Sequence, residues 1–208
     1  MFITFEGPDG CGKTTQAHLI VAALQARGEP VIYTREPGGT EISEQIRQVI
    51  LSTRNLAMQS ETEVLLFSAA RAQIVAELIR PALSAGKIVI CDRYADSTLA
   101  YQGYGLGLDL EALRAITHFA TGGLVPDLTV YVDVPVEVGL LRRQRGETNR
   151  LDQKSVEYHT RVRAGYLALA RAEPHRWVGI DGTRAIEHVH QDILTRLCQF
   201  LEQKGRER

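Results

Sequence analysis

Residues 5–15 read FEGPDGCGKTT and combine glycines with a lysine and a threonine at a spacing that can bind nucleotide phosphates. Gly7, Gly12, Lys13 and Thr14 fit the pattern G-x-x-x-x-G-K-[ST]. Glycine lets backbone N–H groups approach anionic oxygens, the lysine reaches the β- and γ-phosphates, and the threonine hydroxyl can ligate Mg²⁺. The alternative, a Gly-rich turn with a surface lysine, explains neither the strand pattern before the motif nor the helix pattern after it. The nucleotide-binding residues that the motif predicts are Gly7, Pro8, Asp9, Gly10, Cys11, Gly12, Lys13, Thr14 and Thr15.

Two further segments carry side chains that could hold a second ligand, one that is both anionic and aromatic. Arg35 in TREPGGT follows an apolar run, and its planar guanidinium suits bidentate binding of phosphate. Phe67 and Arg71 in LLFSAAR are four residues apart and would share one face of a helix, where a ring can stack on a base and an arginine can donate to its edge. Taken alone, the first would be a solvated turn and the second a core phenylalanine beside a surface arginine.

The stretch DRYADSTLAYQGYG, residues 92–105, adds polar side chains directly after the apolar run KIVIC. Asp92 suits a carboxylate that faces Mg²⁺, although an N-cap aspartate would look the same in sequence. A helix in this stretch would bring Arg93, Ser97 and Tyr101 onto one side. The substrate-binding candidates here are Arg93, Ser97, Thr98, Tyr101 and Gln102.

Residues 140–152, LLRRQRGETNRLD, gather arginines around Gly146. Such a cluster can close over phosphates, exclude water and neutralise charge that develops during phosphoryl transfer, so we predict a lid here. An exposed basic loop is the alternative. The arginines of the predicted lid are Arg142, Arg143, Arg145 and Arg150.

These segments need a scaffold, and short apolar runs alternate with longer helical patterns along the chain. Helical patterns follow the nucleotide-binding motif up to Gly28, cover residues 61–85 with Pro81 bending or ending the helix, and recur over residues 186–200. The alternation predicts an α/β fold with a five-stranded parallel sheet and helices on both faces, whose ligands bind at the carboxyl ends of the strands. The candidate strands are Phe2–Phe5, Val31–Tyr33, Ile88–Cys91, Leu128–Val132 and Trp177–Ile180.

Composition excludes several classes of protein. The chain has 208 residues with 44% hydrophobic and 24% charged side chains, which suits one globular domain, residues 1–208. A formal net charge of -1 argues against a nucleic-acid partner, and three widely spaced cysteines favour the reducing cytoplasm over a disulfide framework or a metal site. We expect no signal peptide and no membrane partner, because neither a leader pattern nor a long apolar run occurs. The guanine-reading N-K-x-D of GTPases and the H-R-D and D-F-G of protein kinases are absent from the sequence.

The motifs FEGPDGCGKTT, TREPGGT, FSAAR, DRYADSTLAYQG, PDLTVYVDV and RGETNR follow one another in an order that resembles the bacterial thymidylate kinase family. The similarity runs from the first strand to the last helix, and TREPGGT together with DRYADSTLAYQG is its discriminating part. The resemblance implies the P-loop kinase fold, transfer of the γ-phosphoryl group of ATP to dTMP with Mg²⁺, and a homodimer. A kinase for another nucleoside monophosphate or deoxynucleoside is the nearest alternative. A more distant one is an ATP-dependent switch that has no small-molecule acceptor.

The resemblance also implies roles for the candidate residues. Phe67 would stack on thymine and Arg71 would bind its carbonyl edge, while Thr98 and Gln102 would face the base. Tyr101 would lie under the sugar. Arg35 and Arg93 would hold the acceptor phosphate. Asp9 would also bind the substrate, as a carboxylate near the acceptor sugar and the metal, and Arg142 would lie beside adenine. The predicted catalytic residues are Lys13, Arg93, Arg145 and Arg150, and the predicted metal ligands are Thr14, Asp9 and Asp92.

Two positions bear on the source of the catalytic arginine. Some family members carry this arginine in the P-loop, at the position that is Gly10 here, so this chain resembles the type whose arginine comes from the lid. Where relatives commonly have an arginine, an aromatic residue and a glutamate at the end of the lid, this chain has Arg150, Leu151 and Asp152.

Overall fold

Parallel strands form one sheet at the centre of the protein. The structure is a computed structural model that describes residues 1–143 and 150–206, without the side chains of residues 152, 153 and 203–206. Within these residues the sheet is five-stranded, with the order β2-β3-β1-β4-β5. The register sets Phe5 beside Asp92 and Val130, so the carboxyl ends of neighbouring strands meet at one edge. All the predicted strands are confirmed, each ending slightly later than expected. The strands are β1 (Phe2–Glu6), β2 (Val31–Arg35), β3 (Ile88–Asp92), β4 (Leu128–Asp133) and β5 (Trp177–Asp181).

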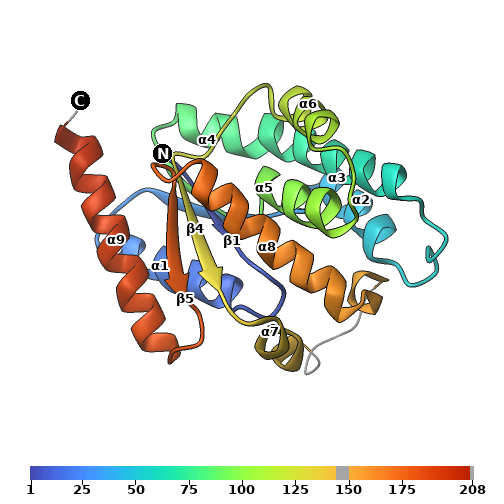
Figure 1. Cartoon of the computed structure of the whole chain (residues 1–208). Coiled ribbons are helices and arrows are strands. Elements are labelled where there is room, and N and C mark those ends of the chain that lie inside the picture. Colours follow the sequence, from blue (N-terminus) through green and yellow to red (C-terminus); the bar gives the residue numbers. More distant parts are fainter. Residues whose placement is uncertain (144–149, 207–208) are drawn as a thin grey trace.

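Helices connect the strands and cover both faces of the sheet. Figure 1 shows α1 (Lys13–Ala26) and α9 (Ile186–Arg206) on one side of the sheet and α8 (Val156–Ala172) on the other. In the part of the chain that is described, no helix has both the length and the apolar character that crossing a membrane would require. The remaining helices are α2 (Glu41–Leu51), α3 (Ser60–Ile74), α4 (Arg80–Ser84), α5 (Ala95–Thr98), α6 (Leu110–Thr121) and α7 (Val136–Arg143), with π-helical segments η1 (Val75–Ile79) and η2 (Leu99–Gly105) and a 3₁₀ turn η3 (Arg150–Gln153).

The alternation of side chains along each strand divides the core into two layers. Ile3 and Phe5 of β1 pack with the apolar stripe of α1, which includes Ile20 and Leu24, and with α9. Phe2, on the opposite face of β1, packs with the residues of α3, η1 and β3. The sheet is therefore buried on both faces, as parallel sheets with crossover helices are.

The helical pattern over residues 61–85 is continuous but changes its winding. After α3 the chain forms the π-helical segment η1 and then α4, and Pro81 lies in the first turn of α4. Pro81 does not end the helix, so the prediction that it ends there is wrong. The regular hydrogen bonding changes instead in the π-helical turn directly before it, which is a common place for a helix to accommodate a proline. The change in winding falls just before the proline.

The segment after β3 also differs from the single helix that was expected. Arg93 precedes the helix and has a φ of 69°, a left-handed conformation that non-glycine residues rarely adopt. Helix α5 then begins at Ala95 and continues into η2. The wider winding of a π-helix shifts side chains relative to an α-helix. Arg93, Ser97 and Tyr101 nevertheless come together as predicted, because the guanidinium of Arg93 donates to both hydroxyls.

Candidate active site

The glycine-rich loop wraps around the amino end of α1. Gly12 has a φ of 92° and immediately precedes Lys13, the first residue of the helix, so the unpaired N–H groups of the first turn are available to an anion. Gly10, with a φ of 74°, lies against α7: a Cβ atom at this position would come within 2.0 Å of the carbonyl oxygen of Gly139. The loop is thus fixed by backbone packing and not only by its own turns.

Two cavities meet at this loop. The first has a volume of about 410 Å³ and the second about 480 Å³, and both are lined by Gly10, Lys13 and Thr14. The second cavity also includes Cys11, Gly12, Thr15 and Arg142. The first cavity brings together the substrate-binding residues predicted from separate motifs, which are Asp9, Arg35, Phe67, Arg71, Arg93, Ser97, Thr98, Tyr101 and Gln102.

Thr14 and Asp92 form an oxygen-rich pair where the cavities meet. The hydroxyl of Thr14 donates a hydrogen bond to Oδ2 of Asp92. Oδ1 of Asp92 is buried and has no hydrogen-bond partner among the described residues. Mg²⁺ prefers hydroxyl and carboxylate oxygens together with phosphate and water, so these two residues fit the predicted metal site. Asp9, the third predicted ligand, uses both carboxylate oxygens for Arg93 and Tyr101, and its metal role stays a prediction.

Arg93 is the centre of the polar network in the first cavity. Its Nη2 donates to Oδ1 of Asp9 at 2.7 Å and to the hydroxyl of Tyr101 at 2.9 Å. Burial alone would raise the pKa of Asp9, but the charges of Arg93 and Lys13 outweigh it and lower the pKa to about 2. Nη1 of Arg93 donates to the Ser97 hydroxyl, the Tyr166 hydroxyl and the carbonyl oxygen of Gly7. These contacts fix the guanidinium in one orientation before any ligand binds.

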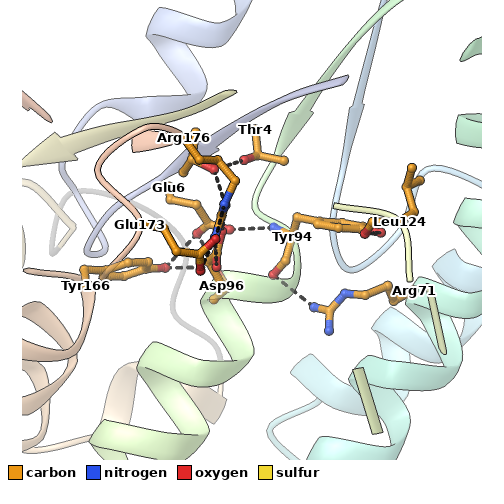
Figure 2. A network of polar contacts seen from close by, with 11 residues as sticks. Thr4, Glu6, Arg71, Tyr94, Asp96, Leu124, Tyr166, Glu173 and Arg176 are labelled. Carbon is orange, nitrogen blue, oxygen red and sulfur yellow. Dashed lines mark hydrogen bonds and ion pairs between the residues drawn. The ribbon is translucent and has the colours of Figure 1, made fainter. Parts of the chain in front are cut away.

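Glu6, at the end of β1, lies behind Arg93 and is fully buried. Its carboxylate accepts hydrogen bonds from the Ser97 hydroxyl at 2.6 Å and the Tyr166 hydroxyl at 2.8 Å, the same hydroxyls that Arg93 contacts. It also accepts from the backbone N–H of Tyr94 at 2.8 Å, as Figure 2 shows. Burial raises the pKa of Glu6 to about 6, with a smaller contribution from the charge of Asp96, against the opposing effect of Arg93.

A buried ion pair between Arg176 and Asp96 supports the start of α5 (Figure 2). Arg176 donates to both carboxylate oxygens of Asp96, at 2.7 and 3.0 Å, and also to Thr129 of β4. The pair joins the segment before β5 to the helix that carries Ser97, so the network around Arg93 rests on groups from distant parts of the chain.

Part of the wall of the first cavity comes from α3. Phe67 and Arg71 both line it, as their spacing predicted. Arg71 is almost completely buried and donates to Glu36 at 2.7 Å and to the Thr98 hydroxyl at 3.0 Å.

Arg35, at the end of β2, lines the same cavity. It pairs with Glu44 at 2.9 Å and is partly exposed, so its guanidinium remains accessible.

The arginines of the predicted lid lie in different environments. Arg142 donates to the carbonyl oxygen of Gly182 at 2.9 Å and lines the second cavity, and Arg143 lines the first. Arg145 lies outside the described residues. Arg150 was predicted to face phosphates, but here it is buried and forms an ion pair with Glu63 at 2.6 Å. The reason is that η3 packs against α2 and reaches α3 through this ion pair, contacts between distant segments that the motif does not encode.

Sequence reasoning missed Glu6, Glu63 and Tyr166. A glutamate that closes a short, buried, mostly apolar strand, as Glu6 does in FITFE, was the available signal for the first. Glu63 precedes Phe67 by four residues and therefore continues the helix face that was already recognised. Tyr166 reaches the site from α8, and only the packing of that helix brings it there.

Comparison with known proteins agrees with this geometry. A family model described as thymidylate kinase matches residues 5–193. A thymidylate kinase from Roseiflexus castenholzii is 54% identical over 207 residues, covering 93% of this chain and 90% of that protein. One from Latilactobacillus sakei is 50% identical over 201 residues, covering 95% and 94%. The crystal structure of thymidylate kinase from Ehrlichia chaffeensis superimposes with a TM-score of 0.77 at 36% identity, covering 95% of this chain and 98% of that one. This chain belongs to the thymidylate kinase family.

Proposed function

We propose that this protein transfers the γ-phosphoryl group of ATP to dTMP, giving dTDP and ADP. The observation that carries the proposal is that two cavities meet at Lys13 and Thr14 of the glycine-rich loop. ATP would occupy the second cavity, with its phosphates on the loop, and dTMP the first. The two nucleotides would then approach each other phosphate to phosphate, which is the arrangement that in-line transfer requires.

The acceptor phosphate is already an anionic nucleophile, so the reaction needs positive charge and positioning more than a general base. Lys13 would bind the transferred phosphoryl group, and Arg93, fixed by its contacts with Asp9 and Tyr101, would hold the acceptor phosphate. Arg145 is our candidate for a further catalytic arginine. Mg²⁺ held by Thr14 and Asp92 would neutralise charge on the β- and γ-phosphates.

Recognition of thymine would rest on α3 and the segment opposite it. Phe67 would stack on the base, and Arg71, which Glu36 and Thr98 hold in place, would donate to a carbonyl oxygen of its edge. Tyr101, whose hydroxyl is engaged by Asp9, would lie under the sugar. The methyl group alone contributes about 1–3 kcal/mol to discrimination, so dUMP would be a poorer acceptor that is not excluded.

We further propose that the protein acts as a homodimer in the cytoplasm. Apolar side chains on α2 and α3 remain exposed, among them Ile42, Val49 and Leu65, and a second copy could bury them. The described cysteines are all free thiols, which suits a reducing compartment. Light scattering during size-exclusion chromatography tests the first point: a dimer has about twice the 23.1 kDa of the chain.

A coupled assay of ADP release tests the activity. We expect dTMP to be the best acceptor when it is compared with dCMP, UMP and thymidine at equal concentrations. Preference for a different monophosphate, or for thymidine, would assign the chain to another acceptor. ADP release that no nucleoside or nucleotide stimulates would indicate a hydrolytic switch and would contradict the proposal.

A further inference from the structure

The helix face that carries Phe67 and Arg71 extends one turn further, to Glu63. The three side chains are spaced four residues apart along α3 and therefore lie in one row. Glu63 is 2% exposed, an unusual environment for a carboxylate. Opposite this row, Thr98 contacts Arg71 and Gln102 contacts Glu63, so polar contacts lie on both sides of Phe67.

Each oxygen of the Glu63 carboxylate has its own partner. Oε1 accepts a hydrogen bond from Nε2 of Gln102 at 2.8 Å, and Oε2 accepts from Nη2 of Arg150 at 2.6 Å. Arg150 also donates from Nε to the carbonyl oxygen of Ile50 at 2.9 Å, near the end of α2. Gln102 and Arg150 are themselves only 4% and 6% exposed. Glu63 therefore joins a wall of the first cavity to the 3₁₀ turn at the end of the arginine-rich segment.

A carboxylate can only accept hydrogen bonds from its neighbours, whereas an amide can donate from its nitrogen or accept at its oxygen. The amide of Gln102 must therefore turn Nε2 towards Glu63, and its Oε1 is the atom left for a ligand in the cavity that Gln102 lines. We infer that Glu63 is a positioning residue for base selection: it fixes the Gln102 amide with its acceptor towards the base, and Arg150 fixes Glu63. This inference rests on the proposed function, because it assumes that a pyrimidine occupies the cavity.

The orientation of the amide selects between bases of nearly identical shape. N3 of thymine carries a hydrogen and donates, whereas N3 of 5-methylcytosine has a lone pair and accepts. An acceptor at Gln102 pairs with thymine and opposes 5-methylcytosine, because two acceptors would then face each other. Arg71 discriminates at the neighbouring exocyclic group, and its contribution is the same in enzymes that differ only at position 63.

Glu63→Gln reverses the selection in a way that depends on Arg150. The arginine can only donate, so it takes the single amide oxygen at position 63 and leaves the NH₂ group facing Gln102. Gln102 then has to offer its own oxygen to that group and presents Nε2 to the cavity. With Arg150→Met added, the amide at position 63 is free to turn, and Gln102 can return to its original orientation.

Calorimetric titration of each enzyme with dTMP and 5-methyl-dCMP tests the inference. The quantity to compare is the ratio of the two dissociation constants, which does not depend on the folded fraction of a preparation. We expect Glu63→Gln to lower the preference for dTMP about 100-fold, and Glu63→Gln with Arg150→Met to recover part of it. Arg150→Met alone should leave the preference unchanged, because the carboxylate still accepts from Gln102.

Glu77→Gln is the matched control, because Glu77 accepts from Nε2 of Gln73 at 2.8 Å in an exposed pair of the same kind, and its preference should equal that of the wild type. An unchanged ratio in Glu63→Gln would overturn the inference. Equal ratios in Glu63→Gln with and without Arg150→Met would show that Arg150 does not fix the orientation of the group at position 63. A wild-type chain that binds dTMP but does not phosphorylate it would contradict the proposed function and leave the orientation test intact.

Discussion

The Arg93 guanidinium and the Asp9 carboxylate form an ion pair of 2.7 Å that joins the turn after β3 to the glycine-rich loop. The pair lies in the cavity that also contains Phe67 and Arg71. It holds the Arg93 guanidinium in the cavity that Lys13 also lines, where the phosphates of two nucleotides would meet. The left-handed backbone of Arg93 is consistent with a residue whose position is set by function, since such conformations cost energy and concentrate at functional sites.

Arg93→Met should lower kcat about 10²–10³-fold, because it removes a preorganised charge from the transferred or acceptor phosphate. Steady-state kinetics with dTMP measures the effect. The matched control is Arg163→Met, which removes an arginine paired with Asp133 at 2.8 Å and should change kcat little. A similar kcat in both variants would exclude Arg93 from the transfer step.

Arg71→Ala should abolish tight binding of dTMP and leave the dissociation constant of ATP nearly unchanged, since Arg71 lines only the first of the two cavities described. Calorimetric titration with each nucleotide separates the two effects. The change also leaves Glu36 buried without its partner, so the free energy of unfolding in urea should fall by about 3–5 kcal/mol. An equal loss of affinity for ATP would contradict the assignment of Arg71 to the acceptor pocket.

Arg150→Ala should act mainly on stability. The sequence favoured a large loss of kcat, but the buried pair with Glu63 predicts a decrease of about 3–5 kcal/mol in the free energy of unfolding. The comparison is Arg184→Ala, which breaks an exposed pair with Asp192 and should cost less than about 1 kcal/mol. If Arg150→Ala unfolds like the wild type while kcat collapses, Arg150 acts on phosphate after all.

Glu6 should make stability depend on pH between about 4.5 and 6. Its pKa in the folded protein, about 6, is above the ordinary 4.5, so the folded state binds this proton more tightly than the unfolded chain. The stability from this group is complete below pH 4.5 and is lost as the pH rises through 6, by about 2 kcal/mol. Urea unfolding of the wild type and of Glu6→Gln over this range measures it. A difference between the two that stays constant with pH would show that Glu6 does not titrate there.

The local part of the fold was predictable from sequence. Each strand is a short β-branched or aromatic run, and β3, IVICD, shows why such runs can be recognised without knowledge of the fold. The π-helical winding of Leu99–Gly105 was not predictable, because it depends on how this segment packs against α8. Pro81 was expected to bend or end a helix; it does not end it, and the winding changes in η1 directly before it.

The candidate site, too, was predictable from sequence only where its residues are neighbours in the chain. Phe67 and Arg71 were recognised as neighbours on one helix face, a local relationship that the spacing contains. The contacts of Glu6 with Tyr166 and of Glu63 with Arg150 join residues far apart in the chain. Such contacts depend on how whole elements pack, so one sequence without its fold could not reveal that Arg150 is buried.

The approach of Gly10 to Gly139 restricts which substitutions evolution can make in this loop. A side chain on either residue would run into the backbone of the other element, since a Cβ atom on Gly139 would come within 2.5 Å of the carbonyl oxygen of Asp9. Moving a cationic side chain into position 10 therefore requires α7 to be displaced in the same step. A descendant of this chain that carried an arginine at position 10 would therefore need coordinated changes in the glycine-rich loop and in α7, not a single replacement.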